Sequence, residues 1–174
     1  VLAVNVSARE FRQADFVAQV QATIQRHAID PKRLKLELTE SLLLENIEDT
    51  VAIMNALNEI GIQFSLDDFG TGYSSLQYLK RLPFDEIKID QSFVRDLAVV
   101  SGDRVIVRTI VVMAKSLNLD VIAEGVETEE QLQILLNKGC THYQGYLFGR
   151  PVPIEQFDTH SRNGQSNPVD EGSK

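Results

Sequence analysis

The feature that most constrains the fold is a regular alternation between short apolar strand patterns and amphipathic helix patterns along the chain. Within residues 62–67, for example, apolar side chains alternate with polar ones, which is the two-residue period of a strand. Strand and helix in repeated succession predict an α/β fold with a mainly parallel sheet and with helices outside it. The predicted strands are residues 2–6, 34–38, 62–67, 87–90, 121–124 and 141–144.

Helix signals fill the intervals between these strands. Val20 and Ile24 belong to an apolar stripe at helical spacing, and a longer helix is expected over residues 102–117. The sequence Thr-Glu-Glu-Gln at residues 128–131 has the signature of a capping box. The helix that it opens is expected to end at Gly139, because glycine commonly terminates helices.

Charge, hydropathy and cysteine content limit the binding partners and the cellular compartments that are expected for this chain. The chain has 174 residues and a formal net charge of −8, which disfavours duplex nucleic acid, since binding it calls for a basic surface. No apolar stretch approaches the ~20 residues that span a bilayer, and no signal peptide opens the sequence. Cys140 is the only cysteine, which fits a reducing compartment. We therefore expect a cytoplasmic protein, or the cytoplasmic part of a membrane-anchored one.

Polar side chains stand at or near the carboxyl ends of all six predicted strands. In a (β/α) barrel these ends meet at one face, where active sites form. Each residue taken alone is also explained as a solvated strand terminus, but the regular order of the set favours a shared site. The residues are Asn5, Glu37, Asp67, Lys88, Glu124 and Gln144.

The acidic members of this set, together with Asp68, predict a divalent-metal site. Carboxylate and amide oxygens, without histidine or cysteine, favour magnesium or manganese over zinc. Asp67 and Asp68 are sequence neighbours, so on a regular strand they would point to opposite faces. A break at residues 69–72, which contain two glycines, is expected to bring both carboxylates to one site. Such a pair suits two metal ions ~3.5–4 Å apart, the arrangement for in-line phosphoryl displacement.

Three further signals each have two interpretations. Lys88 needs a negative partner, which is either a phosphate oxygen or metal-bound hydroxide in a catalytic role, or the carboxylate of Asp67 or Glu124 in an ion pair. The glycine-rich stretch at residues 70–72 resembles a phosphate-binding loop, but a lid or a turn explains it better. Phe148 is a candidate for stacking on a base, although an aromatic residue at this place more often belongs to the core.

Six short motifs occur in an order and spacing that resemble a known family. They are NVSAREF at residues 5–11, LELTES at 36–41, LDDFGTGYSSL at 66–76, KID at 88–90, IAEGVET at 122–128 and QGYLFGRP at 144–151. LDDFGTGYSSL and AEGVET are highly specific. The chain resembles the EAL-domain family, bacterial phosphodiesterases specific for cyclic di-GMP.

The resemblance implies a role for each matching residue of the predicted site. Asn5, Glu37 and Asp67 match metal ligands of the family. Asp68 matches the ligand of the second metal, and Glu124 matches the carboxylate that completes the metal site.

Other matching residues are expected to assist the metal ligands or to contact the substrate. Lys88 matches the lysine beside the attacking water, and Gln144 matches the glutamine that orients a water. Glu40 matches the glutamate that anchors the loop of residues 68–75, and Glu127 matches an acid behind the metal ligands. The substrate contacts are expected from Asp90, Phe148 and Pro151.

One departure concerns ExLxR, the motif for which the family is named, which this chain does not contain. In the family its glutamate is a metal ligand and its arginine holds a ligand phosphate. Only six strands are predicted, where a TIM-like barrel has eight. Residues 1–157 are therefore expected to be a partial EAL domain that lacks the N-terminal strands. The polar residues 158–174 are expected to be a disordered tail.

The resemblance implies hydrolysis of cyclic di-GMP to linear pGpG with two Mg²⁺ or Mn²⁺ ions. Because one metal ligand and the phosphate-binding arginine are absent, we expect weak or no activity from these residues alone. Two alternatives remain: a module that binds cyclic di-GMP without cleaving it, and a regulatory dimerisation module. The expected partners are cyclic di-GMP, a second copy of the chain, and an upstream GGDEF or sensor domain in the same polypeptide.

Overall fold

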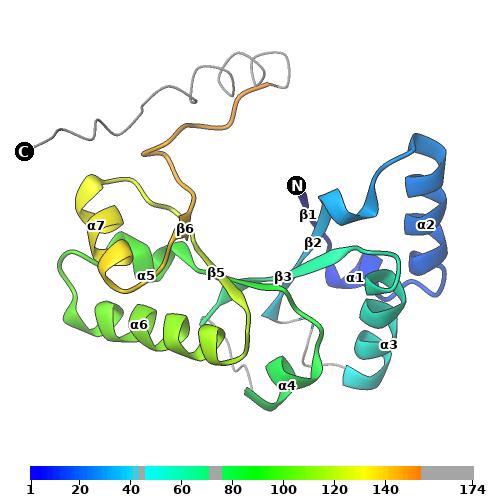
Figure 1. The fold of residues 1–174 in the computed structure, drawn as a ribbon, viewed down its shortest axis with the longest axis horizontal. Helices are drawn as coiled ribbons and strands as arrows, with labels where there is room; N and C mark the ends of the chain where they lie inside the picture. The colour runs from blue at the N-terminus through cyan, green and yellow to red at the C-terminus, as the bar shows by residue number, and fades with distance from the viewer. Residues whose placement is uncertain (41, 43–45, 71–75, 154–174) are drawn as a thin grey trace, which may run out of the picture.

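A computed structural model describes residues 1–40, 42, 46–70 and 76–153 of the chain (Figure 1). Six strands form one sheet in the order β1-β2-β3-β4-β5-β6, and every neighbouring pair is parallel. This topology confirms the predicted α/β class. The strands are β1 (Leu2–Asn5), β2 (Leu34–Thr39), β3 (Gln63–Phe69), β4 (Glu86–Ile89), β5 (Asp120–Ala123) and β6 (His142–Tyr143).

The sheet curls into an incomplete TIM-like barrel, with the helices on its outer, convex side (Figure 1). The long helix expected over residues 102–117 is confirmed by α6. The capping box of residues 128–131 is also confirmed, because Gln131 N–H donates to Thr128 Oγ1 at 3.2 Å and Thr128 N–H donates to Gln131 Oε1 at 3.0 Å. The helices are α1 (Ala8–Phe11), α2 (Phe16–His27), the 3₁₀ turn η1 (Pro31–Arg33), α3 (Ile47–Asn58), α4 (Leu76–Arg81), α5 (Gln91–Arg95), α6 (Ser101–Ser116) and α7 (Glu129–Asn137).

Three short helices, α1, α4 and α5, were not predicted. They have four to six residues each, so they are too short to show an apolar period. One of them carries a recognisable local signal. Ser7 caps α1, and the Ser7 N–H donates to Glu10 Oε2 at 3.1 Å, which is the capping box that Ser-x-x-Glu encodes.

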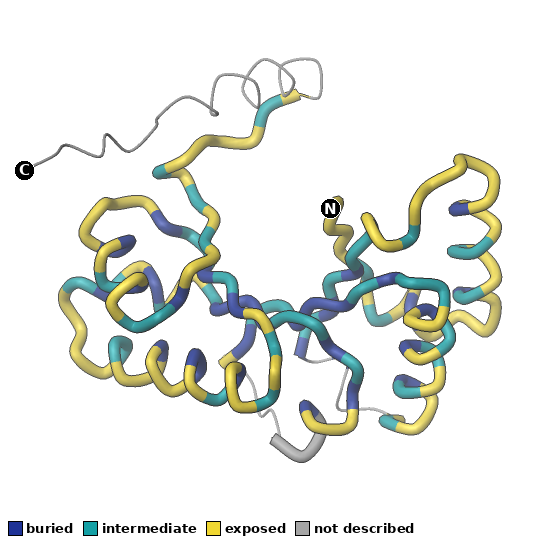
Figure 2. Tube along the Cα trace, in the orientation of Figure 1, coloured by how far each residue is buried: buried dark blue, intermediate teal, exposed yellow. Residues whose placement is uncertain are grey.

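The strands separate apolar from polar side chains across the sheet. On β2, β3 and β4 the apolar residues Leu36, Phe64 and Ile87 are 4% or less exposed and belong to the core under the helices. Figure 2 shows the buried positions gathered along the sheet and on the helix faces that meet it. The alternate side chains on these strands, including Glu37 and Lys88, therefore face the concave inner side of the incomplete barrel.

The first strand lies at an edge of the sheet. Val1, Leu2 and Val4 are 77%, 67% and 39% exposed, whereas Leu36 of β2 and Phe64 and Leu66 of β3 are 4% or less exposed. An incomplete barrel explains this exposure, because a closed barrel has no strand edge. Among the described residues, no helix is both long and apolar enough to cross a bilayer. The predicted boundary at residues 157/158 and the polar tail lie outside the described residues.

The structure corrects the predicted position of the break near the two aspartates. The prediction placed it at residues 69–72, but the irregularity lies within β3, before Phe69. Leu66 pairs with Ile87 and Phe69 pairs with Ile89, so β3 holds one residue more than β4 across this interval. Asp68 takes the left-handed conformation, with φ of 55°. Asp68 therefore makes the break within β3, and Gly70, directly after the strand, is also left-handed, with φ of 100°. Residues 71 and 72 lie outside the described part of the chain.

Candidate active site

The candidate site is organised around the ammonium group of Lys88 on β4. Its Nζ lies 3.0 Å from Glu37 Oε1, 3.1 Å from Asp67 Oδ1 and 2.6 Å from Glu124 Oε1. These carboxylates come from β2, β3 and the end of β5 and are only 11–16% exposed, and the Lys88 side chain is 6% exposed. Of the two sequence-based interpretations of Lys88, the ion pair with carboxylates is the arrangement in this structure. We call Glu37, Asp67, Asp68 and Glu124 the carboxylate cluster.

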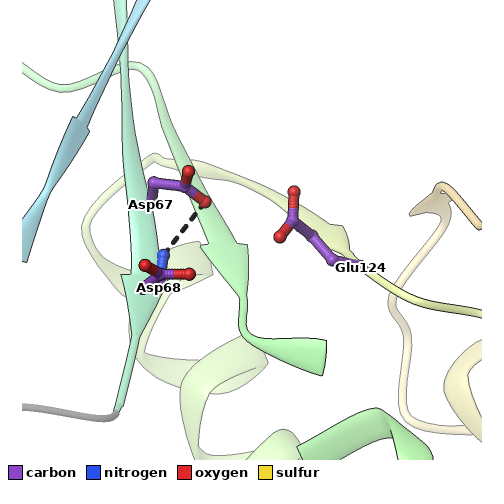
Figure 3. A group of neighbouring side chains, drawn as sticks. All are labelled: Asp67, Asp68 and Glu124. Carbon is purple, nitrogen blue, oxygen red and sulfur yellow. Dashed lines mark hydrogen bonds between the residues drawn. The ribbon is translucent and has the colours of Figure 1, made fainter. Parts of the chain in front are cut away.

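Asp68 joins this cluster because of the irregularity in β3. Its backbone N–H donates to Asp67 Oδ1 at 3.0 Å, which turns the two neighbouring side chains toward one region instead of opposite faces. Carboxylate oxygens of Asp67, Asp68 and Glu124 lie within 4.8 Å of one another. Figure 3 shows Glu124 facing Asp67 across the open end of the strands, with Asp68 next to Asp67.

The electrostatics of the cluster show an excess of negative charge. Burial by itself lowers the pKa of Lys88, but hydrogen bonds to Glu124 and Glu37 outweigh burial and raise the pKa above its ordinary value. Burial raises the pKa of the Asp68 carboxyl, and the charges of Asp67 and Asp90 raise it further. The Lys88 ammonium is thus firmly held in its charged form, and a single positive charge faces four carboxylates.

These residues fit a divalent cation. The donors are carboxylate oxygens, which Mg²⁺ and Mn²⁺ prefer, and the surplus negative charge favours a cation. Magnesium binds oxygen at about 2.0–2.1 Å, so ligand oxygens on opposite sides of the ion lie ~4 Å apart. The observed spacing of up to 4.8 Å therefore needs only a small closing movement. Asp67, Asp68 and Glu124 are three described residues whose carboxylates lie close enough together to hold such an ion.

Two amide side chains predicted at the site lie beside different members of the cluster. Gln144 Nε2 donates to Glu124 Oε1 at 2.6 Å, so this glutamine fixes the carboxylate that also binds Lys88. Asn5 ends β1 and lies opposite Glu37 in the sheet register, at an exposed position. The structure therefore brings Gln144 into the site and Asn5 to its border.

Asp90 lies directly beyond β4 and next to Asp68. Its Oδ1 accepts a hydrogen bond from Ser92 N–H at 2.9 Å, which caps α5. A hydrogen bond between the carboxyls of Asp68 and Asp90 is one reason for the raised pKa of Asp68. Asp90 thus contacts the carboxylate cluster, and its expected substrate contact stays a prediction.

The two acids expected to support the site differ in their surroundings. Glu40 follows β2 and is 5% exposed, and most of the loop that it is expected to anchor, residues 71–75, lies outside the described residues. Glu127 is exposed, and its backbone N–H donates to Gln131 Oε1 at 2.8 Å. Gln131 also donates to Arg95 O at 3.1 Å, so it ties the loop after β5 to α5. Sequence reasoning used Gln131 only as a helix cap and missed this link.

A cavity of about 760 Å³ adjoins the cluster at Glu124 and Gln144. Phe148 is 53% exposed in its wall and stacks on Tyr143, with ring centroids 4.9 Å apart, so it is not a core residue. Pro151 also lines the cavity. The sequence analysis assigned no role to Tyr143 or to Arg150, although Arg150 lies within the QGYLFGRP motif.

Arg150 and Tyr146 add a second aromatic contact to this wall. The guanidinium carbon of Arg150 lies 4.6 Å from the centroid of the Tyr146 ring, which is a cation–π distance. Tyr146 is 52% exposed. These partly exposed aromatic rings suit a ligand that has a flat ring, because such rings stack on one another.

An incomplete (β/α) barrel with a carboxylate–lysine cluster at the carboxyl ends of its strands defines a barrel protein with a candidate divalent-metal site. The chain belongs to the EAL domain family, since the family model described as EAL domain matches residues 1–151. It is 48% identical over 156 residues to the bifunctional diguanylate cyclase/cyclic di-GMP phosphodiesterase MucR of Pseudomonas aeruginosa. That match covers 90% of this chain and 23% of MucR.

Solved structures show the same similarity. The MucR phosphodiesterase in complex with c-di-GMP aligns with a TM-score of 0.86, at 48% identity, over 89% of this chain and 63% of that one. The EAL domain of Mycobacterium smegmatis DcpA aligns with a TM-score of 0.90, at 38% identity, over 96% and 75%. Klebsiella pneumoniae BlrP1 in a manganese/cyclic di-GMP complex aligns with a TM-score of 0.79, at 32% identity, over 86% and 38%. The chain spans less than a quarter of the length of the curated relatives it matches first.

Proposed function

We propose that this chain is part of a metal-dependent phosphodiesterase that hydrolyses cyclic di-GMP to linear pGpG. The observation that carries the proposal is the contact of Lys88 with Glu37, Asp67 and Glu124, beside a further carboxylate on Asp68. The name of MucR and the c-di-GMP complexes of MucR and BlrP1 support the substrate. In the reaction one water adds to phosphorus and one ester P–O bond breaks, which leaves a phosphomonoester and a free hydroxyl.

The proposed metal ligands are the carboxylate cluster together with the Asn5 amide. Mg²⁺ or Mn²⁺, when bound, supplies positive charge for the phosphate and lowers the pKa of the attacking water. The manganese complex of BlrP1 supports this choice of ion. Asp67 lies between Asp68 and the Lys88–Glu124 pair, so its carboxylate would hold metal together with both neighbouring carboxylates.

Lys88 and Gln144 are proposed to act on the reacting groups. Lys88 is buried and remains charged. Its three N–H donors face Glu37, Asp67 and Glu124 in this structure, so its ammonium would donate to the attacking water or to a phosphate oxygen once one of these carboxylates turns to a bound metal ion. Gln144 uses its amide nitrogen on Glu124, which leaves its carbonyl oxygen to accept a hydrogen bond from a water. Both residues thereby orient the water that attacks.

The aromatic cavity is proposed to bind the base and ribose of the substrate. Phe148 and Tyr146 present partly exposed rings in its wall, and base–aromatic stacking contributes about 1–3 kcal/mol per base. Asp90 and Pro151 are proposed as further substrate contacts. Glu40 and Glu127 are proposed to support the loops that carry the metal ligands.

Residues 1–157 are proposed to be a partial EAL domain, followed by a polar tail at 158–174. The six strands and the 63% coverage of the MucR structure support the proposal that the domain is partial. We therefore propose that these residues alone are weakly active or inactive. We also propose homodimerisation and an upstream GGDEF or sensor domain, and the description of MucR as bifunctional supports the upstream GGDEF domain.

The proposal is tested by replacing Asp67 with Asn in the longest natural polypeptide that contains this chain. Product formation from cyclic di-GMP is followed by chromatography with Mn²⁺ or Mg²⁺ present, and Asp15→Asn, at an exposed position before α2, is the matched control. We expect Asp67→Asn to abolish turnover and the control to retain it. Near-normal turnover by Asp67→Asn would contradict the assignment of Asp67 as a metal ligand of the active site. Tight binding of cyclic di-GMP without any product, in the unmodified protein with metal, would instead show a binding module.

A further inference from the structure

A second layer of polar side chains lies beneath the carboxylate cluster. Lys35, Ser65 and Glu86 each precede a residue of the site by two positions, on β2, β3 and β4 respectively. Side chains two positions apart on a strand point to the same face, so these three face the inner side of the barrel below the site. We call Lys35, Ser65 and Glu86 the lower layer.

Two contacts to the Glu86 carboxylate hold the lower layer together. Lys35 Nζ lies 2.9 Å from Glu86 Oε2, and Ser65 Oγ donates to Glu86 Oε1 at 2.9 Å. Both oxygens of Glu86 are therefore engaged. The ion pair joins β2 to β4 across the intervening strand, and Ser65 supplies the contact from that strand, β3.

These contacts are shielded from solvent. The side chains of Lys35 and Glu86 are 16% and 14% exposed, and Ser65 is fully buried. A shielded carboxylate requires a cation or several donors, because an uncompensated buried charge is strongly destabilising. Lys35 supplies that charge in this structure.

The ion pair of Lys35 with Glu86 affects the site because Glu86 lies close to Lys88. Lys88 follows Glu86 by two positions on the same face of β4, so its ammonium is the next cation along that face. A Glu86 carboxylate without Lys35 would compete with the carboxylate cluster for Lys88. A lysine stem is long and flexible enough to turn to a neighbour at this separation.

We propose that the lower layer is a positioning device: Lys35 and Ser65 hold both oxygens of Glu86 and so keep Lys88 directed to the carboxylate cluster. Lys35 and Glu86 do not touch the reacting groups, and they act through Lys88. A catalytic effect of this positioning rests on the proposed function. The position of the Lys88 ammonium itself does not depend on that function.

The test follows the Lys88 ammonium directly, by NMR of the chain carrying ¹³C,¹⁵N-labelled lysine, with Lys88→Met to assign the signal. Lys35→Met removes the ammonium and keeps most of the stem. Lys35→Arg keeps the charge. The double variant Lys35→Met/Glu86→Gln removes both charges, and Lys115→Met, at an exposed position on α6, is the matched control.

We expect the Lys88 signal to shift in Lys35→Met, to return in the double variant and to stay unchanged in Lys35→Arg and Lys115→Met. A crystal structure of Lys35→Met should show Lys88 Nζ within hydrogen-bonding distance of Glu86. An unchanged Lys88 signal in Lys35→Met overturns the proposal, and so does a shift that Glu86→Gln fails to reverse. Such results would leave the lower layer a purely stabilising ion pair.

A milder variant keeps the test decisive should Lys35→Met not fold. Ser65→Ala removes one hydrogen bond to Glu86 and retains both charges, so a smaller shift of the Lys88 signal in the same direction is expected. No shift in Ser65→Ala would contradict the proposal. None of these readouts needs substrate. The proposed function is tested separately, in the longest natural polypeptide that contains this chain: absence of cyclic di-GMP hydrolysis there, together with the expected Lys88 shifts, would refute the proposed function and leave the positioning role of the lower layer supported.

Discussion

The Lys88 ammonium on β4 lies 2.6 Å from the Glu124 carboxylate at the end of β5, and both side chains are largely buried. The same ammonium also contacts Glu37 and Asp67, so three strands besides its own converge on it. One positive charge thus holds together carboxylates that would otherwise repel one another. This arrangement makes Lys88 important for folding as well as for the proposed chemistry.

Replacing Lys88 with Met should therefore destabilise the chain strongly. Removing one partner of a buried ion pair costs about 3–5 kcal/mol, and here three carboxylates lose their partner. The free energy of unfolding is measured by urea titration. Adding Mn²⁺ should restore part of the loss, because a cation that binds only the folded state stabilises it.

The matched control for Lys88→Met is Arg81→Met, which breaks the exposed pair of Arg81 with Glu48 at 3.2 Å. Exposed pairs contribute at most about 1 kcal/mol, so this variant should be nearly neutral and insensitive to Mn²⁺. Equal losses in the two variants would show that the carboxylate cluster does not depend on Lys88.

Asp68 contributes both a left-handed backbone conformation and a negative charge, and two substitutions can distinguish these contributions. Alanine in this conformation costs about 1–2 kcal/mol, whereas glycine adopts it freely. We expect Asp68→Ala to lower both the stability and the Mn²⁺ affinity, and Asp68→Gly to lower only the affinity. Thermal unfolding and isothermal titration measure the two effects.

Asn118 provides the control for Asp68, because it has a similar φ of 58° and lies away from the site. Asn118→Ala should lower stability by a comparable amount and leave Mn²⁺ affinity unchanged. The interpretation of Asp68 is wrong if Asp68→Gly binds Mn²⁺ as well as the unmodified chain does.

Gly145 allows a close approach between the loop after β5 and the segment after β6. A Cβ at Gly145 would lie 2.2 Å from Val126 O and 2.3 Å from Val126 N, so the two backbones would have to separate. Gly145→Ala should cost about 1–3 kcal/mol or more in urea unfolding. Gly149→Ala is the control, since nothing lies within 4 Å of its added Cβ, and an equally small effect of both variants would contradict this account.

The single cysteine reports on unfolding. Cys140 is 1% exposed, and burial raises the pKa of its thiol, so the reactive thiolate is scarce in the folded state at pH 8. Because the pKa of the thiol is raised, a higher pH is needed to form the thiolate in the folded chain than in the unfolded chain. Reaction with a disulfide reagent should be slow in native buffer and fast in urea. Rapid, complete reaction of the native chain would show that Cys140 is accessible.

Several properties followed from sequence pattern alone. The alternation of residues 62–67 predicted a strand with two faces, and Phe64 and Leu66 are buried while Asp67 faces the site. The long helix α6 and the capping box at Thr128 were also predictable, because their signals are local and periodic. The short helices α1, α4 and α5 were not, since four to six residues carry no period.

The sequence predicted which residues belong to the site, but it did not predict which of them contact one another. Lys88, Glu124 and Gln144 were placed at one face by the rule that parallel strands end together. The simultaneous contact of Lys88 with three carboxylates depends on the register of neighbouring strands, which pairs Lys88 with Ile122. Register is set by packing across the sheet, so no local pattern reveals it.

The sequence by itself determined the α/β class, the order of the strands, the family and the residues at the strand ends, because strand and helix periods and short motifs are properties of neighbouring positions. The tertiary structure alone decided that Asp68, rather than a glycine, breaks β3. It also decided that Lys35 and Glu86 pair across a third strand beneath the site. These features arise from contacts between residues far apart in the chain, and such contacts exist only once the sheet has curled.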